Sequence, residues 1–499
     1  MRKSLKLISG GRVLDLAFDL DKPPVMDVLI EGDRILATGE EASRIAAQSE
    51  RVENIDAAGK LLIPGLINTH YHSHDVLLRG SYEQLPLDIW GLYTHPANYP
   101  SLTPQDIRLR TLLGAADALC NGITTLQDMV TIIGSDPIHV ESILAGYQKS
   151  GARAAIGLQI ADAAAVDAVA YWNDLPDGVR RQLPGASDPA GLMGLVERTI
   201  EDPSDARVSW VLAPSAPQRC SDALLKWVAR LSQDHDLPVF THVYEARSQV
   251  AIARQKYPDG SLLTHLERFG LVNSRLTIAH GVWMEEEEIR RFGAAGGNLA
   301  FNPMSNMKLR NGFAPIVAYA EAGVNIGLGC DNCSCNDSQN LFQVMKMFAM
   351  FWGFQKQAGE SDAARLAFEA ATLGGARALG RGHELGAIRP GYLADLVLID
   401  LKAANYRPLN SALRQLVYGE SGLNIRAVMV GGEIVVREGK LVGASDSELK
   451  EAAEAARARM EAEVLMANVR YQSMMEALLR AYESAEQFSL PYDRFSMRR

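Results

Sequence analysis

The stretch LIPGLINTHYHSHD, residues 62–75, decides how the chain folds. It begins as an apolar run with a Pro-Gly step and ends in His70, Tyr71 and His72, a pattern typical of a buried parallel strand that ends in polar residues. Side chains two positions apart in a strand project to the same face, so His70 and His72 point together. Two imidazoles at one strand end suit a divalent metal ion, but an ordinary pair of strand histidines explains an isolated motif equally well.

Apolar runs of strand length alternate with helical patterns through the middle of the chain. Helical patterns cover, for example, residues 104–120, 221–235 and 285–296. Eight runs between such patterns fit strands: 61–68, 122–129, 152–160, 207–214, 238–245, 276–282, 297–303 and 324–331. Eight strands alternating with helices predict an α/β fold, a (β/α)8 TIM barrel. The polar stretch 161–206 is interpreted as an insertion in a loop that follows a barrel strand.

The two ends of the chain have a different sequence pattern from the middle. Short strand-like segments fill residues 1–60 and return at 391–401 and 425–443, which predicts one small β-domain built from both ends. After Gly443 the chain is rich in Ala, Glu, Met and Arg, which predicts one long helix or two. An apolar stripe in this tail is expected to pack on the body or on another subunit, and it predicts a homodimer or a larger homo-oligomer.

Composition excludes several classes of function. The chain has 499 residues, a net charge of −10 and no run rich in Lys or Arg, which argues against nucleic acid and anionic membranes as partners. No stretch approaches the roughly 18 apolar residues of a transmembrane helix. The apolar part of the first residues is too short and broken for a signal peptide. Five cysteines in so long a chain do not form a secreted disulfide framework, so a reduced, cytoplasmic protein is expected.

Polar residues cluster where the predicted barrel strands end. The active site of such a barrel lies at the carboxyl ends of its strands, so these side chains are expected to converge on one mouth. Imidazole and carboxylate groups suit Zn²⁺, or Fe²⁺ and Mn²⁺ with less discrimination. The converging residues are His70, His72, His242, Glu245, His280 and Asp331.

Several motifs in this order resemble those of the amidohydrolase superfamily. The closest branch is the cytosine/guanine deaminase and triazine hydrolase group, the atrazine chlorohydrolase-like proteins. The resemblance covers roughly residues 5–445. The motifs are PGLINTHYH, LLRG at 77–80, GITT followed by Asp128, HVYE, AHGVW, NPMSN with Lys308, GLGCDN and GYLADLVLID.

This resemblance implies a distorted (β/α)8 barrel with a small β-sandwich domain made from both chain ends. The implied boundaries are 1–62 with 380–445 for the β-domain and 63–379 for the catalytic barrel. The tail at 446–499 becomes a helical extension that lies partly outside the resemblance.

The resemblance also implies roles for the clustered residues. Glu245 matches the acid that shuttles protons, and His280 matches the histidine that orients the water or stabilises the attacking hydroxide. Binuclear members carry a carboxylated lysine at the end of strand four, where this chain reads VLAPSAPQRC without Lys. One divalent metal ion per subunit is therefore implied, with Zn²⁺ expected and Fe²⁺ as the alternative. The implied metal ligands are His70, His72, His242 and Asp331.

Three functions are compatible with this site. The leading one is deamination of an N-heterocyclic small molecule such as a purine, pyrimidine, pterin or s-triazine. In this reaction an activated water, assisted by Asp331 and His280, attacks an sp² carbon while Glu245 protonates an adjacent nitrogen. The second function is hydrolysis of an amide, urea or carbamate, or removal of chloride, in an aromatic compound. The third, a non-catalytic scaffold, is disfavoured because every ligand position is filled.

Other polar residues near the motifs receive weaker interpretations. Cys330, Cys333 and Cys335 are interpreted as packing residues, not as a thiolate metal site. If the strand continues to His74, its side chain shares a face with the ligands and would support them or face the substrate, but a role in the site is not the favoured interpretation. Asp128 is interpreted as a structural carboxylate.

Overall fold

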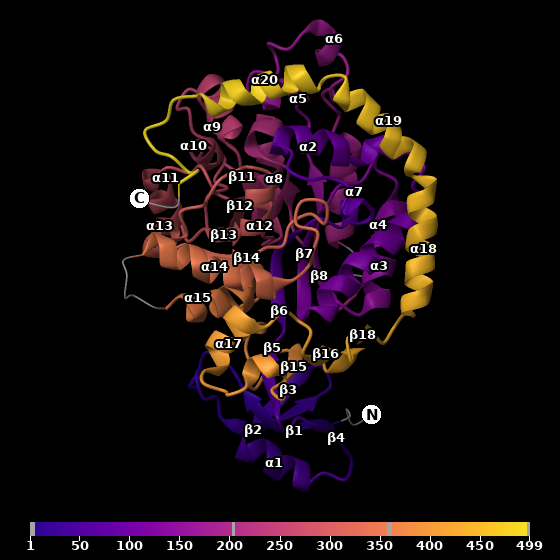
Figure 1. Cartoon of the computed structure of the whole chain (residues 1–499), viewed down its shortest axis with the longest axis vertical. Helices are drawn as coiled ribbons and strands as arrows, with labels where there is room; N and C mark the ends of the chain where they lie inside the picture. The colour runs from indigo at the N-terminus through magenta and orange to yellow at the C-terminus, as the bar shows by residue number, and fades with distance from the viewer. Residues whose placement is uncertain (1–4, 202–204, 357–361, 497–499) are drawn as a thin grey trace.

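The computed structural model describes residues 5–201, 205–356 and 362–496. These ranges form a barrel, a β-domain at its lower end and a long helical tail around its side (Figure 1). Within them, no helix combines the length and apolar character needed to cross a bilayer.

Eight strand positions form the parallel barrel that the sequence predicts. Its strand order is β10-β8-β7-β6-β14-β13-β12-β11, and β9 pairs with β8. The ring closes where Leu212 N donates to Pro238 O at 2.9 Å. The strands are β6 (Leu66–Tyr71), β7 (Ile123–Val130), β8 (Arg153–Ile160), β9 (Val208–Trp210), β10 (Ala213–Pro214), β11 (Val239–Val243), β12 (Leu276–His280), β13 (Asn298–Phe301) and β14 (Asn325–Leu328).

The fourth strand position departs from the prediction of one strand at 207–214, because it is broken into β9 and β10. Both segments pair with β8 in the same register, and between them Val211 N donates to Ile156 O of β8 while Leu212 N donates to Pro238 O beside β11, both at 2.9 Å. The fourth position is therefore one strand interrupted at Val211 and Leu212.

Helices of the barrel layer lie close to the predicted ranges because their caps are encoded locally. The range 104–120 is helix α3, begun by a capping box between Thr103 and Asp106. Ser221 caps α8 through Leu224 N. The barrel-layer helices are α2 (Leu87–Thr94), α3 (Pro104–Cys120), α4 (Pro137–Ser150), α8 (Asp222–Asp234), α9 (Arg247–Lys256), α10 (Leu262–Glu267), α11 (Glu286–Ala294), α12 (Pro303–Lys308), α13 (Ile316–Glu321), α14 (Leu341–Gln355), α15 (Ala363–Glu369) and α16 (Gly375–Ala378).

The predicted insertion at 161–206 folds over the barrel rim between β8 and β9. It contains α5 (Ala165–Ala168), α6 (Asp177–Arg180) and α7 (Ala190–Glu201). Residues 202–204 of this stretch lie outside the described ranges.

Both chain ends contribute to one β-domain, as predicted. Its nine strands hydrogen-bond in a continuous sheet of order β18-β17-β16-β15-β5-β1-β2-β3, with β4 paired to β1. Helices α1 (Glu40–Ala47) and α17 (Ala412–Gly419) flank it. The strands are β1 (Leu5–Val13), β2 (Val25–Glu31), β3 (Arg34–Thr38), β4 (Val52–Asp56), β5 (Lys60–Pro64), β15 (Leu396–Asp400), β16 (Ile425–Val430), β17 (Glu433–Arg437) and β18 (Lys440–Leu441).

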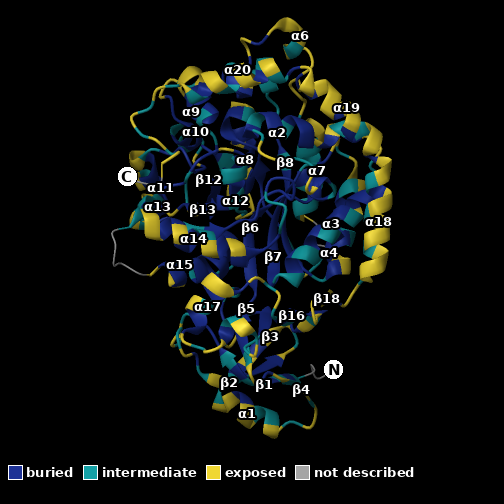
Figure 2. Cartoon of the chain, viewed as in Figure 1, coloured by how far each residue is buried: buried dark blue, intermediate teal, exposed yellow. Residues whose placement is uncertain are grey.

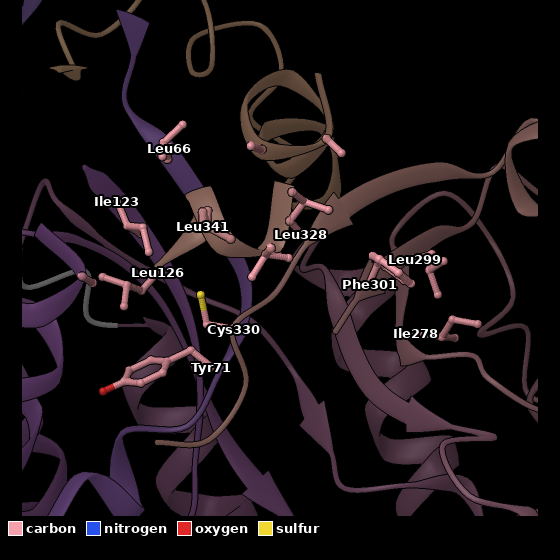
Figure 3. Packing of buried hydrophobic residues seen from close by; sticks show 14 of the residues in the cluster. Leu66, Tyr71, Ile123, Leu126, Ile278, Leu299, Phe301, Leu328, Cys330 and Leu341 are labelled. Atoms are coloured by element: carbon pink, nitrogen blue, oxygen red, sulfur yellow. The ribbon is translucent and has the colours of Figure 1, made fainter. Parts of the chain in front are cut away.

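Apolar side chains of the strands and the outer helices pack together in one large core (Figure 3). Each buried Leu, Ile or Phe contributes roughly 1.5–3 kcal/mol to folding. Cys330 lies among these side chains, and Cys333 and Cys335 are also buried. The labelled core residues of Figure 3 are Leu66, Tyr71, Ile123, Leu126, Ile278, Leu299, Phe301, Leu328, Cys330 and Leu341.

The tail forms three helices where the sequence suggested one or two. They are α18 (Asp446–Arg459), α19 (Glu461–Gln472) and α20 (Met475–Glu486). Helix α18 contacts α3, α19 contacts α2, and α20 contacts α9. The breaks at buried Met460 and Met474 let the tail curve around the barrel, so its outer side is exposed (Figure 2).

A buried ion pair joins the barrel to the β-domain. Arg153 on β8 donates from Nε and Nη2 to both carboxylate oxygens of Asp395, at 2.9 and 3.0 Å. Asp395 also accepts a hydrogen bond from Gly431 N at 2.7 Å. Removing one partner of such a pair leaves an uncompensated buried charge.

Substituting Arg153→Ala should therefore lower the free energy of unfolding by about 3–5 kcal/mol, measured by urea denaturation. The matched control is Arg44→Ala, which breaks the exposed pair with Glu41 and should change the free energy of unfolding far less. Equal effects of the two substitutions would contradict this role for the buried pair.

Candidate metal centre

The six residues predicted from strand ends converge at the carboxyl end of the barrel. The strands supply them in order: His70 and His72 at the end of β6, His242 on β11 with Glu245 just after it, and His280 at the end of β12. Asp331 follows β14. Two groups of these residues have ligand atoms within 4.8 Å of one another, namely His70, His72 and His242, and His70, His280 and Asp331.

The hydrogen bonds of His72 and His242 show that the cluster fits a cation. The Nδ1 atom of His72 lies 2.6 Å from the carbonyl oxygen of Met129, and that of His242 lies 2.6 Å from the carbonyl oxygen of Ser215. A carbonyl only accepts, so both Nδ1 atoms carry the proton in a neutral ring. Burial lowers the pKa of His72 to about 3, which keeps its ring neutral. The Nε2 lone pairs of these two rings therefore face each other at 3.3 Å.

Two facing lone pairs repel unless a cation lies between them, so this arrangement is suited to a metal ion. His70 extends the set, because its Nε2 lies 3.2 Å from Nε2 of His72. Carbonyl oxygens bonded to the far nitrogens fix the orientation of His72 and His242, as is usual for metal-binding histidines.

Asp331 completes the donor set. One of its oxygens lies 3.4 Å from His70 Nε2 and 3.6 Å from His72 Nε2. Its backbone N donates to the carbonyl oxygen of His70 at 2.9 Å. Burial alone would raise the pKa of Asp331, but the hydrogen bond and charge of His70 outweigh it and hold the pKa well below its usual range. Asp331 therefore offers an anionic oxygen donor at neutral pH.

Glu245 and His280 line a chamber beside this cluster. The Nε2 atom of His280 lies 3.6 Å from a Glu245 oxygen and 3.8 Å from an Asp331 oxygen. Burial raises the pKa of Glu245 to about 7. A carboxyl group with a pKa near neutrality can both hold and release a proton during a reaction.

Two amide side chains that orient these groups were not identified from the sequence. Asn306 Oδ1 lies 2.8 Å from His280 Nδ1, and Asn311 Nδ2 donates to Glu245 Oε1 at 3.0 Å. Asn306 belongs to the NPMSN motif, which marked its region without indicating its role. No sequence pattern pointed to Asn311, because its contact with Glu245 joins residues 66 positions apart.

The structure also shows where Asp128, His74 and the cysteines lie relative to the cluster. Asp128 accepts hydrogen bonds from Ser73 N at 2.9 Å and Tyr147 OH at 2.8 Å and belongs to neither candidate ligand group. His74 accepts a hydrogen bond from Thr131 N and lines the chamber beside the cluster. No cysteine is part of a candidate metal group in the described ranges.

Two connected cavities lie above the cluster. The inner chamber, of about 110 Å³, is lined by the site residues together with His74 and Trp90. The outer cavity, of about 490 Å³, lies beneath the 161–206 insertion. The two cavities share Gly91, His95, Thr131, Gln159 and Arg219.

Several known proteins are similar to this chain in sequence and in fold. The model of the amidohydrolase family matches residues 61–435. The 5-methylthioadenosine/S-adenosylhomocysteine deaminase of Pyrococcus abyssi is 32% identical over 438 residues, covering 87% of this chain and 95% of the relative. The 5'-deoxyadenosine deaminase of Methanothermobacter thermautotrophicus is 30% identical over 461 residues, covering 91% and 98%.

Two solved structures with bound zinc are similar to this chain in fold. An adenosine deaminase from Xanthomonas campestris with bound zinc has a TM-score of 0.79 at 29% identity, covering 92% of this chain and 98% of that one. The atrazine chlorohydrolase of Arthrobacter aurescens complexed with zinc has a TM-score of 0.79 at 23% identity, covering 91% and 100%, and thus shares the fold. The chain belongs to the amidohydrolase family and is a hydrolase that acts on carbon–nitrogen bonds.

Proposed function

We propose that this chain is a zinc-dependent deaminase that removes the exocyclic amino group of an adenosine-type nucleoside. The observation that carries the proposal is the placement of Glu245, whose carboxyl group of near-neutral pKa lines the chamber beside the histidine cluster. The deaminases of adenosine derivatives among its relatives support the choice of substrate.

His70, His72, His242 and Asp331 would hold the metal ion. A divalent metal at such a site acts as a Lewis acid and lowers the pKa of a coordinated water to about 7. The chain's own residues then move the protons. Asp331 and the free Nε2 of His280 accept hydrogen bonds from the attacking water and orient it.

Glu245 delivers the proton that makes the carbon electrophilic. The protonated carboxyl group donates to the ring nitrogen next to the carbon that bears the amino group, while water adds to that carbon. Asp331 accepts the proton that the water loses and passes it to the amino group, while the Glu245 carboxylate takes back the proton of the added hydroxyl group. The carbon–nitrogen bond then breaks, and ammonia leaves with the ring carbonyl as product. Asn311 holds the other oxygen of Glu245, so the donating oxygen faces the chamber.

The paired cavities favour a nucleoside over a free base. The inner chamber has room for the reacting edge of a purine, and the outer cavity has room for a sugar and its substituent. Arg219 lines both cavities, and its Nη2 atom lies 4.0 Å from Oδ1 of Asp88. Together these two side chains offer donors and acceptors for sugar hydroxyl groups.

The test is a panel assay that scores each leaving group separately. Adenosine, 5'-deoxyadenosine, free adenine, cytosine, an aminated s-triazine, a chlorinated s-triazine and an aryl urea are incubated with the purified protein. Ammonia release from the two nucleosides, with kcat/KM at least about 10-fold above that for adenine, is the expected result. Release of amine from the urea or of chloride from the triazine, without ammonia from a nucleoside, would overturn the proposal.

The metal content should be about one zinc per chain, measured by inductively coupled plasma mass spectrometry on protein purified without added metal. One ion is expected because strand four ends in Ala213, Pro214 and Ser215, and none of these is a lysine that could be carboxylated to bridge two ions. Two ions per chain would contradict this prediction, and one iron would correct the choice of metal.

We also propose a cytoplasmic location, a homodimer or larger homo-oligomer, and the domain boundaries predicted from the sequence. All five cysteines are free, which supports a reducing compartment. Leu465, Met466 and Val469 expose apolar surface on α19, which supports contact with another subunit.

A further inference from the structure

The end of the described chain returns to the barrel after the last helix. Residues 488–496, here named the C-terminal strap, leave α20 and run down beside α11 (Figure 1, yellow). The strap lies beyond residues 61–435, which match the family model. It packs against the segment that follows β12, three residues after His280.

Three contacts fasten the strap to Trp283 and its neighbour. Tyr492 OH donates to the carbonyl oxygen of Trp283 at 2.8 Å, and Arg494 Nη2 donates to that of Met284 at 3.0 Å. The ring of Phe495 meets the indole of Trp283 edge to face, with centroids 5.3 Å apart. Trp283 is fully buried by these contacts and by the barrel.

The same tryptophan holds the residue that bonds to Glu245. Trp283 Nε1 donates to the carbonyl oxygen of Asn311 at 2.6 Å. Asn311 N donates to Asn306 O at 2.7 Å, and Asn311 Nδ2 donates to Glu245 Oε1 at 3.0 Å. Asn311 is thus fixed at its backbone on both sides, and its side chain reaches the carboxyl group from a set position.

A fourth contact joins the strap to the loop that carries Asn311. Phe313 N donates to the carbonyl oxygen of Arg494 at 2.7 Å. Between Asn311 and Phe313, Gly312 has φ of 110°, and a Cβ atom there would lie 2.7 Å from the Arg494 carbonyl oxygen. Only glycine allows this backbone to approach the strap so closely.

From these contacts we propose that the C-terminal strap is a positioning element for Glu245, acting through Trp283 and Asn311. None of the strap contacts described above involves the substrate chamber or the predicted metal ligands. It fixes the oxygen of Glu245 that accepts from Asn311 and so aims the other oxygen at the reacting nitrogen. The proposal deepens the proposed function and rests on it for the role of Glu245.

The main experiment compares the full chain with a chain that ends at Leu490. Truncation should lower kcat for the best nucleoside by about 10²-fold, because an error of about 1 Å in a reacting group has effects of that size. KM and zinc content should change by less than about 3-fold. Adding a synthetic peptide of residues 491–499 should restore part of the lost kcat.

A double-mutant cycle tests whether the strap acts through Asn311. Asn311→Ala alone should lower kcat about as much as the truncation does, and combining the two should add little. Tyr492→Phe, which removes one strap hydrogen bond, should lower kcat more than the matched control Tyr471→Phe, which removes the α19 hydrogen bond to Asn98. Additive losses, or an unchanged kcat in a folded, zinc-loaded truncated chain, would overturn the proposal.

Hydrogen exchange separates this proposal from the proposed function. Truncation should speed amide exchange in residues 309–314 relative to 222–234 of α8, whatever the substrate is. Absence of nucleoside deamination together with faster exchange at 309–314 would overturn the proposed function and leave the strap's support of Asn311 standing. Unchanged exchange at 309–314 would overturn the strap proposal even if the enzyme deaminates nucleosides.

Discussion

Glu245→Gln should lower kcat for nucleoside deamination by about 10³-fold, within the 10²–10⁴-fold range of general acid–base catalysis. The amide keeps the shape of the side chain and can accept the hydrogen bond from Asn311 Nδ2. It cannot take up a proton and pass it to the substrate. The zinc content should stay at the native level, because Glu245 is not one of the predicted ligands.

The pH dependence of kcat/KM provides a second test of the role of Glu245. Burial raises the pKa of Glu245 to about 7, so the proton-donating form is present below that pH and is lost as the pH rises through it. The value of kcat/KM should therefore fall above about pH 7. A profile that keeps rising to pH 9 would contradict a role for Glu245 as the acid.

Glu286→Gln is the matched control for this substitution. Glu286 lies exposed in the first turn of α11, away from the cluster, so the same chemical change there should leave kcat within about 2-fold. A loss below 10-fold in Glu245→Gln, with ammonia still released, would assign proton transfer to another residue.

The histidine cluster could be predicted because its geometry is set by local rules. His70 and His72 share a face through strand alternation, and the carboxyl ends of parallel strands bring His242, His280 and Asp331 to the same mouth. The left-handed backbone at His280 and Asp331, with φ of 73° and 64°, was not predictable, because no pattern in the sequence signals it.

The supporting contacts could not be predicted because they join distant segments. Asn311 meets Glu245 across 66 positions, and Tyr492 meets Trp283 across 209. The three-part tail follows from curvature around the barrel, which composition does not reveal.

Removing the metal should abolish deamination and also destabilise the fold. Without a cation, the Nε2 lone pairs of His72 and His242 face each other at 3.3 Å with nothing to compensate their repulsion. Treatment with a chelator should lower the activity by at least about 10³-fold, and added zinc should restore it. The free energy of unfolding should fall as well, by about 4 kcal/mol if free zinc had stood at 1,000 times its Kd.

His242→Ala tests the same site without a chelator. It removes one ligand and the partner of the Ser215 carbonyl oxygen, so the purified variant should contain less than about 0.1 zinc per chain and added zinc should not restore its activity. The matched control is His235→Ala, an exposed histidine beyond α8 that should keep both zinc and activity. If His242→Ala kept its zinc and its kcat, His242 would not be a ligand. If the chelated protein kept its kcat with no zinc bound, the histidine cluster would have to act by acid–base chemistry alone, which the neutral, lone-pair-facing rings do not support.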